Sequence, residues 1–533
     1  MPAPEPVPLP NDVLRTLHGL RGRLGREKAG KLGLDLNVAV HFKDPQVALD
    51  EPGVGLDSDF TVPWEPGLGD GPTSARFRIL PTDGKVARWD AKARCFTDSA
   101  DKPIDGSDLD TPEYRQVRTW AVLQNTLDHV EGPFGMGRRL DWNFAGNRLL
   151  VDTAFSNERN AYYNRDQKRL EFHHYQDDEG ATVHTCLSTD IVNHELAHAI
   201  LDGVRPMFLT KGVKEHEAFH ESVGDILALL LALRNNRFRK TVADRTEGDL
   251  TDGLASGLAR QFGLTVSKKP HLRSAASSLT MADLPGQNFH DASQILTGAV
   301  FDYLVALVAG YRARRGVTIY EALWYAVRRV QTTFLQALDL LPPLDPRFAD
   351  LGQAMVQAIL IAEPLDPKGY AALLRQCFAK RGIELPSDEA ARLRLTPADP
   401  DEIARSRGAA YRWLDDNRTA LDIPADADLT LAGPFLADKR GPDGRALPVQ
   451  ISIPYAWMNE RDSNGIVLQA PCGATLVIDT RSNVLSWARK PGAETEAGAA
   501  RIQGLAEAMA LAPAGDGILR CAPAVTKEDP VHV

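Results

Sequence analysis

The stretch Ile191-Val192-Asn193-His194-Glu195-Leu196-Ala197-His198-Ala199-Ile200 decides what we expect of this chain. Residues four apart leave a helix from the same face, so His194 and His198 can reach one metal ion. Glu195 follows the first of them, close enough to hold a water bound to that metal. Apolar residues at helical spacing and an N-cap at Ser188 or Thr189 predict that the stretch is a helix.

A second helical stretch, from about 215 to 233, would supply the third ligand, because catalytic zinc usually takes three protein ligands and a water. It carries Glu221 and Asp225 four residues apart. Glu221 completes a two-His, one-Glu set, and Asp225 can accept the second ring N–H of a ligand histidine. Glu217 is an alternative ligand that lacks an Asp four residues later. We therefore expect one zinc ion per chain, bound by His194, His198 and a glutamate that is preferably Glu221.

These motifs resemble those of the thermolysin-like (M4-type) zinc metallopeptidases and the wider glutamate-zincin group. Residues 190–202 are similar to the zinc helix of that family throughout. The stretch His220-Glu221-Ser222-Val223-Gly224-Asp225 is similar to its second zinc helix, in which an Asn usually stands where this chain has His220. The resemblance extends over about 155 to 384, with the motifs in the family's order.

The resemblance implies further site residues. The stretch Asn160-Ala161-Tyr162-Tyr163-Asn164 is similar to the edge strand that binds substrate, so Asn160 and the backbone of Ala161 would hold the peptide. Leu272-Arg273-Ser274 is similar to the segment with the substrate-gripping arginine, and Arg273 would also pair with Asp225. His290-x-x-Ser293-x-Ile295 resembles the start of the helix with the catalytic histidine, so His290 would donate to the oxyanion. Asp225 and His220 would support the ligand histidines from behind.

The expected activity is zinc-dependent hydrolysis of peptide bonds, with Glu195 as the general base on a zinc-bound water. The resemblance favours an endopeptidase that acts on peptide or protein substrates. One alternative is a zinc-containing protein-interaction module that no longer cleaves peptides, against which the intact Glu195 and His290 argue. The other is an aminopeptidase of the same group, although the chain has no Gly-x-Met-Glu-Asn stretch to bind a free amine.

The chain departs from the family's pattern at three places. No Tyr lies between His198 and Glu221, where the family has one that helps to stabilise the oxyanion. The acid five residues before the catalytic histidine is replaced by Pro285, and Asp283 is the nearest substitute. Ala232 replaces a calcium-binding acid, which makes calcium doubtful although Asp190 is kept.

Composition excludes several other classes. The net charge of 61 − 71 = −10 argues against general nucleic-acid binding. We find no run that approaches the length of a membrane span and no signal-peptide core, so we expect a cytoplasmic protein. Five widely spaced cysteines favour reduced thiols over a disulfide framework.

The predicted fold is α+β: a two-lobed zincin core with a strand-rich upper lobe and a helical lower lobe, followed by a small β-rich domain. We predict an N-terminal arm and linker over 1–74, the peptidase domain over 75–385 and an accessory domain over 386–533. A strand is expected over 34–40, loop over 44–73 and a hairpin around Asn164-Arg165-Asp166-Gln167. Apolar periodicity predicts helices over 113–130, 290–314, 318–341, 346–362 and 367–382.

After Pro386 we expect one charged helical region over 390–421 and a helix over 493–510. Between them lie short apolar runs broken by Gly, Pro, Asn and Asp, which predict a set of short strands. These runs are 429–431, 449–454, 466–468, 475–478 and 484–488.

Overall fold

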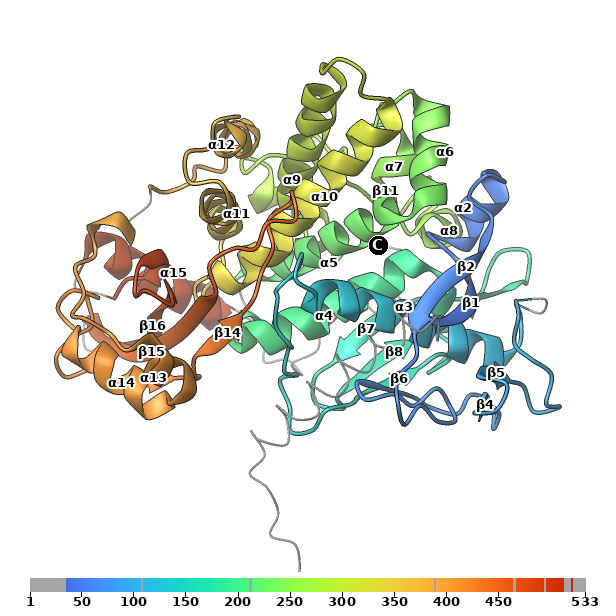
Figure 1. Ribbon diagram of the computed structural model, residues 1–533, viewed down its shortest axis with the longest axis horizontal. Helices are drawn as coiled ribbons and strands as arrows, with labels where there is room; N and C mark the ends of the chain where they lie inside the picture. The colour runs from blue at the N-terminus through green and yellow to red at the C-terminus, as the bar shows by residue number, and fades with distance from the viewer. Residues whose placement is uncertain are drawn as a thin grey trace, which may run out of the picture.

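The computed structural model describes residues 35–106, 109–209, 213–387, 390–463, 466–492, 495–511 and 519–520. The fold is mixed α+β, as predicted. Figure 1 shows helices α4 (Thr189–Val204) and α5 (Lys214–Arg234) at the centre, with most of the N-terminal strands on one side and a group of helices on the other. The elements between residues 400 and 511 gather at one end of the molecule, whereas residues 519–520 pair with a strand beside the central helices.

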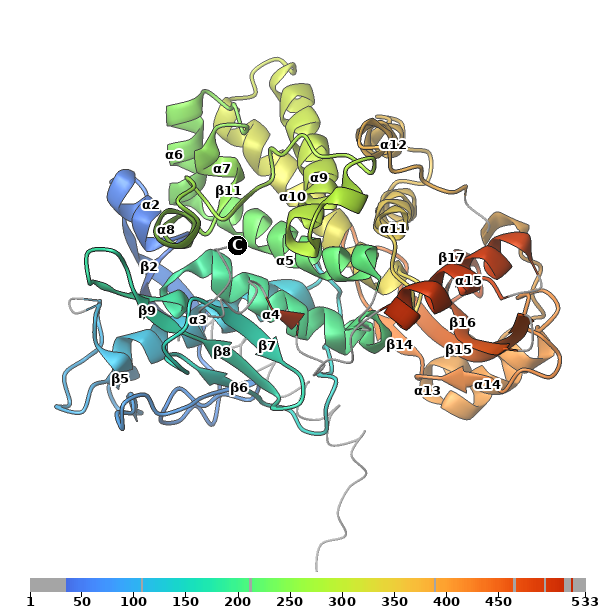
Figure 2. The ribbon, with the colours of Figure 1, turned by 180° about the vertical axis from the view of Figure 1, so that it is seen from behind.

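The sheet beside helix α4 has the strand order β18-β7-β8-β6-β3. Strand β7 pairs antiparallel with β8, which confirms the predicted hairpin, whereas β3, β6 and β8 run parallel. Figure 2 shows β7 and β8 in front of α4. The strands are β3 (Phe77–Ile79), β6 (Leu149–Asp152), β7 (Ala161–Asn164), β8 (Arg169–Phe172) and β18 (Leu519–Arg520).

The N-terminal part contains more regular structure than predicted. Strand β1 (Asp35–His41) is where it was expected, but the predicted loop over 44–73 contains helix α2 (Pro45–Asp50) and strand β2 (Leu56–Pro63). Strand β2 pairs antiparallel with β1. Val40 and Val62 of this hairpin are fully buried and belong to the same hydrophobic core as helix α4. Gly and Asp in this segment therefore mark turns around short elements and not a linker.

The bounds of the helices around the site agree with the predicted ranges to within a few residues. Ser188 caps α4 through its side chain, and Thr111, Asn288 and Thr318 cap α3, α9 and α10 in the same way. Helix α4 packs on α5, and α5 on α9. The helices are α3 (Pro112–Glu131), α4 (Thr189–Val204), α5 (Lys214–Arg234), α6 (Asn236–Thr246), α9 (Phe289–Arg312), α10 (Ile319–Ala337), α11 (Phe348–Ala362) and α12 (Tyr370–Lys380).

Helix α9 corrects the expectation that no run reaches the length of a membrane span. Its 24 residues include a window with a mean hydropathy of 1.6, which is long and apolar enough to cross a membrane by length and composition. However, 72% of that window is buried inside the fold. Helices α5, α10 and α12 cover it, so its apolar character is explained by its place in the core.

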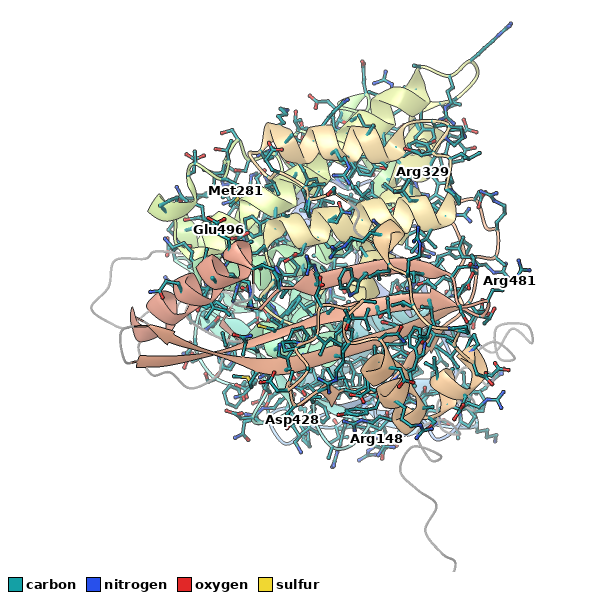
Figure 3. The ribbon with its side chains drawn as sticks, turned by 90° about the vertical axis from the view of Figure 1, so that its left-hand side faces the viewer. Arg148, Met281, Arg329, Asp428, Arg481 and Glu496 are labelled. Carbon is teal, nitrogen blue, oxygen red and sulfur yellow. The ribbon has the colours of Figure 1, made fainter. Side chains whose placement is uncertain are left out.

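The C-terminal part forms a separate hydrophobic cluster around a second sheet. The short runs predicted over 466–468 and 475–478 both belong to one long strand, β16, which has fourteen residues. Its partner β15 also has fourteen residues. Figure 3 faces this sheet and labels Arg481, in the turn after β16, and Glu496, at the start of α15. The sheet consists of β13 (Thr430–Leu431), β14 (Phe435–Ala437), β15 (Gln450–Ser463), β16 (Ile466–Asp479) and β17 (Val484–Lys490).

The helical region predicted over 390–421 is broken into pieces. It contains a 3₁₀ turn (Ala390–Arg392), α13 (Pro400–Arg405) and α14 (Arg407–Asp416). Pro400 starts α13 at the position where proline is tolerated, which ends any continuous helix before it. Helix α15 (Glu496–Leu511) lies close to its predicted position.

Three ion pairs among the described residues join the C-terminal part to the core, and in one of them Lys439 Nζ lies 3.0 Å from Asp339 Oδ2. Lys490 Nζ lies 2.7 Å from Asp350 Oδ2, and Arg501 NH1 lies 3.1 Å from Asp345 Oδ2.

Candidate metal centre and active site

Three side chains from two helices converge on one point. His194 and His198 leave the same face of α4, and their Nε2 atoms lie 3.1 Å apart. Glu221 on α5 completes the group, with Oε2 3.3 Å from His194 Nε2 and Oε1 3.4 Å from His198 Nε2. All three residues are buried, and Glu217 does not belong to this group.

The group fits a zinc ion. Bonds of the usual length in a tetrahedral zinc site put neighbouring ligand atoms about 3.3 Å apart, close to the three separations found here. Both carboxylate oxygens of Glu221 are buried without a hydrogen-bond partner among the described residues. The Arg273 guanidinium lies 3.7 Å from Oε2, and a metal ion between the ring nitrogens and this carboxylate would offset the remaining cost of burying it. Two imidazoles and one carboxylate are a typical ligand set for catalytic zinc.

Asp225 and Arg273 hold the first ligand in place. Asp225 Oδ1 lies 3.0 Å from His194 Nδ1, which leaves Nε2 for the metal. The Arg273 guanidinium donates to both oxygens of Asp225 at 2.8 Å, the pairing that the sequence predicted. Ser293 Oγ also donates to Asp225 Oδ2, at 3.4 Å. This buried network fixes the tautomer and the ring orientation of His194.

His220 plays the corresponding part for the second ligand. The Nδ1 atoms of His198 and His220 lie 3.3 Å apart and their rings stack, with centroids 5.5 Å apart. Burial and the neighbouring His198 hold the pKa of His220 well below its usual value, so its ring is neutral and can accept a hydrogen bond. His198 can then donate from Nδ1 and keep Nε2 for the metal.

The electrostatics of the group favour a cation. Burial raises the pKa of Glu221, but His290 and the two ligand histidines outweigh it and hold this carboxylate well below its usual pKa. Burial lowers the pKa of His194, yet Asp225 and Glu221 raise it to about 10. Without a metal this cluster therefore keeps a proton on His194, and metal binding has to displace it.

His290, near the start of α9, reaches this cluster. Its Nδ1 atom lies 3.1 Å from Glu221 Oε2, and the side chain is buried. Asp283, the predicted substitute for the missing acid, instead accepts hydrogen bonds from the backbone and hydroxyl of Thr280, at 2.8 and 2.9 Å. His290 thus has the predicted place near the metal ligands, but not the predicted acidic partner.

Glu195 is fully buried on α4, next to the first ligand. It lines a cavity of about 30 Å³ together with His194 and Arg273. The other wall is largely apolar and includes Ile191, Leu258, Phe262 and Leu272. The space holds roughly one water molecule.

The predicted substrate strand borders this cavity. Ala161 of β7 lines it, and its backbone N–H donates to Asn160 Oδ1 at 2.9 Å. Asn160 is buried, and its Nδ2 has no hydrogen-bond partner among the described residues. The strand was expected to have a free edge, but β18 pairs with it over Tyr162 and Tyr163. In this structure a segment of the same chain therefore occupies part of that edge.

The carboxylate of Asp190, which the resemblance would place in a calcium site, has only hydrogen-bond donors as partners among the described residues. Lys43 Nζ lies 3.4 Å from its Oδ2 atom, and Ala259 N donates to the same oxygen at 3.0 Å. Calcium is bound by several oxygen ligands, whereas here an ammonium group supplies a positive charge beside Asp190.

Sequence reasoning missed the roles of Gly224 and Lys43. A Cβ on Gly224 would lie 2.5 Å from His194 Nδ1, so α5 can approach the ligand ring only with glycine there. A glycine inside an apolar helix costs stability, which was the available signal. Lys43 lies between the strand predicted over 34–40 and the loop predicted over 44–73, and no motif marks it.

No family model matches this chain, and no curated protein matches it. One similar solved structure is the precursor of protealysin, a metalloproteinase from Serratia proteamaculans, with a TM-score of 0.35. The two sequences are 18% identical, and the match covers 54% of this chain and 84% of that one. Function therefore has to be argued from the site itself.

Proposed function

We propose that this chain is a zinc-dependent metallopeptidase, an endopeptidase with a thermolysin-like, two-lobed zincin core. The observation that carries the proposal is the convergence of His194, His198 and Glu221 beside the buried Glu195. Asp225, His220 and Arg273 around the ligands support it, because supporting hydrogen bonds of this kind are typical of functional metal sites.

The chain's own residues divide the chemistry as follows. Zinc, when bound, supplies a Lewis acid that polarises the scissile carbonyl and makes water a stronger acid. Glu195 accepts the proton of the attacking water and returns it to the leaving amine. His290 donates to the oxygen that becomes negative in the transition state. Asn160 and strand β7 hold the peptide in extended form across the site.

The endopeptidase assignment can be tested with N-acetylated peptides, since an aminopeptidase needs a free amine. We expect the zinc-loaded protein to cleave an N-acetylated peptide of about ten residues at an internal bond, with both products identified by mass spectrometry. Release of single residues from a free N-terminus, with no cleavage of the acetylated peptide, would support an aminopeptidase instead.

His290→Ala should lower kcat by roughly 10²–10³-fold and change KM little, because the hydrogen bond forms mainly in the transition state. Zinc content should stay at wild-type level, since His290 is not a ligand. Steady-state kinetics and metal analysis on the same preparation test this. Unchanged kcat, or zinc lost together with activity, would contradict the assignment.

Strand β18 should compete with substrate for β7, because one strand edge pairs with one partner at a time. The double variant Leu519→Pro/Arg520→Pro removes both backbone N–H groups of β18, including the one that faces β7, so KM should fall, by roughly fivefold or more. Leu519→Ala/Arg520→Ala keeps the backbone donors and is the matched control. Equal KM values for wild type and both variants would show that β18 does not compete.

A further inference from the structure

A second, larger cavity lies beside the zinc helix and contains none of the predicted site residues. Its volume is about 560 Å³, within the range of small-molecule sites. The β1–β2 hairpin, α3, α4, α5, the start of α6 and α10 all contribute to its wall. Figure 1 shows β1, β2 and α6 on the side of the central helices away from the C-terminal part.

The cavity has a cation in its wall without an acidic partner. Arg234 lines it, and no described residue that lines it is Asp or Glu. The hydrogen bond of Arg234 goes to a neutral acceptor, Gln331 Oε1, at 3.2 Å. Burial and the guanidinium groups of Arg239 and Arg328 lower the pKa of Arg234 to about 10, so it remains charged at neutral pH. A partly buried charge of this kind favours an anion from outside the chain.

The neighbouring Arg239 adds to the positive charge of Arg234 and does not neutralise it. Arg239 is also buried, and its described hydrogen-bond partners are two backbone carbonyls, Asn236 Oδ1 and the hydroxyl of Tyr320. The N-terminus of α6, an eleven-residue helix, forms another part of the cavity wall, and such an end attracts negative charge. Arg234, Arg239 and the N-terminus of α6 therefore all favour the binding of an anion.

A buried amide offers a further donor. Asn193 is 2% exposed and lines the cavity from α4. Its Oδ1 accepts a hydrogen bond from Thr126 Oγ1 at 2.6 Å, and its Nδ2 has no acceptor among the described residues. Asn193 precedes His194, so its side chain leaves α4 about 100° around the helix from that ligand. The cavity thus contacts the zinc helix on another face than the metal.

Three large aromatic side chains form another part of the wall. Phe42 and Phe60 pack with their ring centroids 5.8 Å apart. Trp324 of α10 also lines the cavity, and the Arg234 guanidinium lies 5.8 Å from its ring centroid. Such rings bind planar apolar groups. A cation and an unpaired amide beside aromatic rings select a ligand with both an anionic and a planar apolar part.

We propose that this cavity binds a small organic anion, whose negative group pairs with Arg234 and whose planar apolar body lies against Phe42, Phe60 and Trp324. The ligand's anionic group is a carboxylate or a phosphate. The proposal does not depend on peptidase activity.

The test is isothermal titration calorimetry on the zinc-loaded full chain. The probes are indole-3-carboxylate, its neutral carboxamide and phenyl phosphate. We expect at least one of the two anions to bind, with the carboxamide about tenfold weaker or more. Which anion binds more tightly distinguishes a carboxylate site from a phosphate site.

Variants locate the binding. Arg234→Met should lower the affinity for the anion by roughly 10–100-fold, because it removes the charge and keeps the length of the side chain. Thr61, an exposed residue in the cavity wall, allows a second test without touching the core. Thr61→Glu should lower the affinity for the anion about threefold, and Thr61→Lys should raise it. Arg245→Met is the control, since Arg245 is exposed on α6, pairs with Glu51 and does not line the cavity.

Three outcomes would overturn the proposal: neither anion binds, the carboxamide binds as tightly as the carboxylate, or the affinity does not respond to the variants. The last result would place the anion elsewhere, for example at the metal. If Arg234→Met fails to fold, the opposite responses of the two Thr61 variants still decide.

Discussion

Glu195→Gln should retain about one zinc ion per chain and lose peptide hydrolysis by roughly 10²–10⁴-fold. The amide occupies the same space as the carboxylate but cannot accept the proton of the attacking water. Because Glu195 is not among the three ligands, the metal should stay in place. Metal analysis and single-turnover cleavage of a fluorogenic peptide measure the two effects separately.

The matched control is Glu217→Gln, on the neighbouring helix and outside the ligand group. It makes the same chemical change and should leave turnover near the wild-type value. Wild-type turnover in Glu195→Gln would rule out the general-base role. Loss of zinc in that variant would mean that Glu195 is needed for the metal.

Glu221→Ala should lower zinc affinity by more than about 100-fold and abolish activity with it. The two histidines alone leave an incomplete ligand set, and catalytic sites usually need three protein ligands. Removing this carboxylate also takes away the negative charge that His194, His198 and His290 face. Competition with a chromophoric chelator gives the affinity of wild type and variant under the same conditions.

Glu217→Ala separates the two candidates for the third ligand. In the structure Glu217 is not part of the group, so this variant should bind zinc as tightly as wild type. Full retention of zinc in Glu221→Ala, together with loss in Glu217→Ala, would move the third ligand to Glu217.

The zinc helices could be predicted because several local signals agree in them. His194 and His198 are four residues apart, Ser188 provides a cap, and the apolar residues of α4 and α5 follow the helical period. The pairing of Arg273 with Asp225 spans 48 residues and was predicted only through the resemblance to a family. Geometry that depends on contacts between distant segments has no signal in a local pattern.

The incorrect predictions have physical causes. Residues 44–73 were predicted to be loop because Gly, Pro and Asp are frequent, yet their apolar residues complete the core. The short apolar runs of β16 were predicted to be separate strands. They form one strand because cross-strand pairing with β15 continues through residues of low strand propensity. Helix α9 is apolar on most sides since other helices cover it. The cavity around Arg234 is formed by seven elements and could not be inferred from any one of them.

The most direct test of the central claim is digestion of denatured casein by the full chain, with and without a zinc chelator. We expect cleavage at internal bonds that stops when the metal is removed, returns on addition of about one equivalent of zinc, and is absent in Glu195→Gln. Wild-type protein that holds one zinc ion and still leaves casein intact would contradict the claim. It would favour a zinc-containing interaction module that does not cleave peptides.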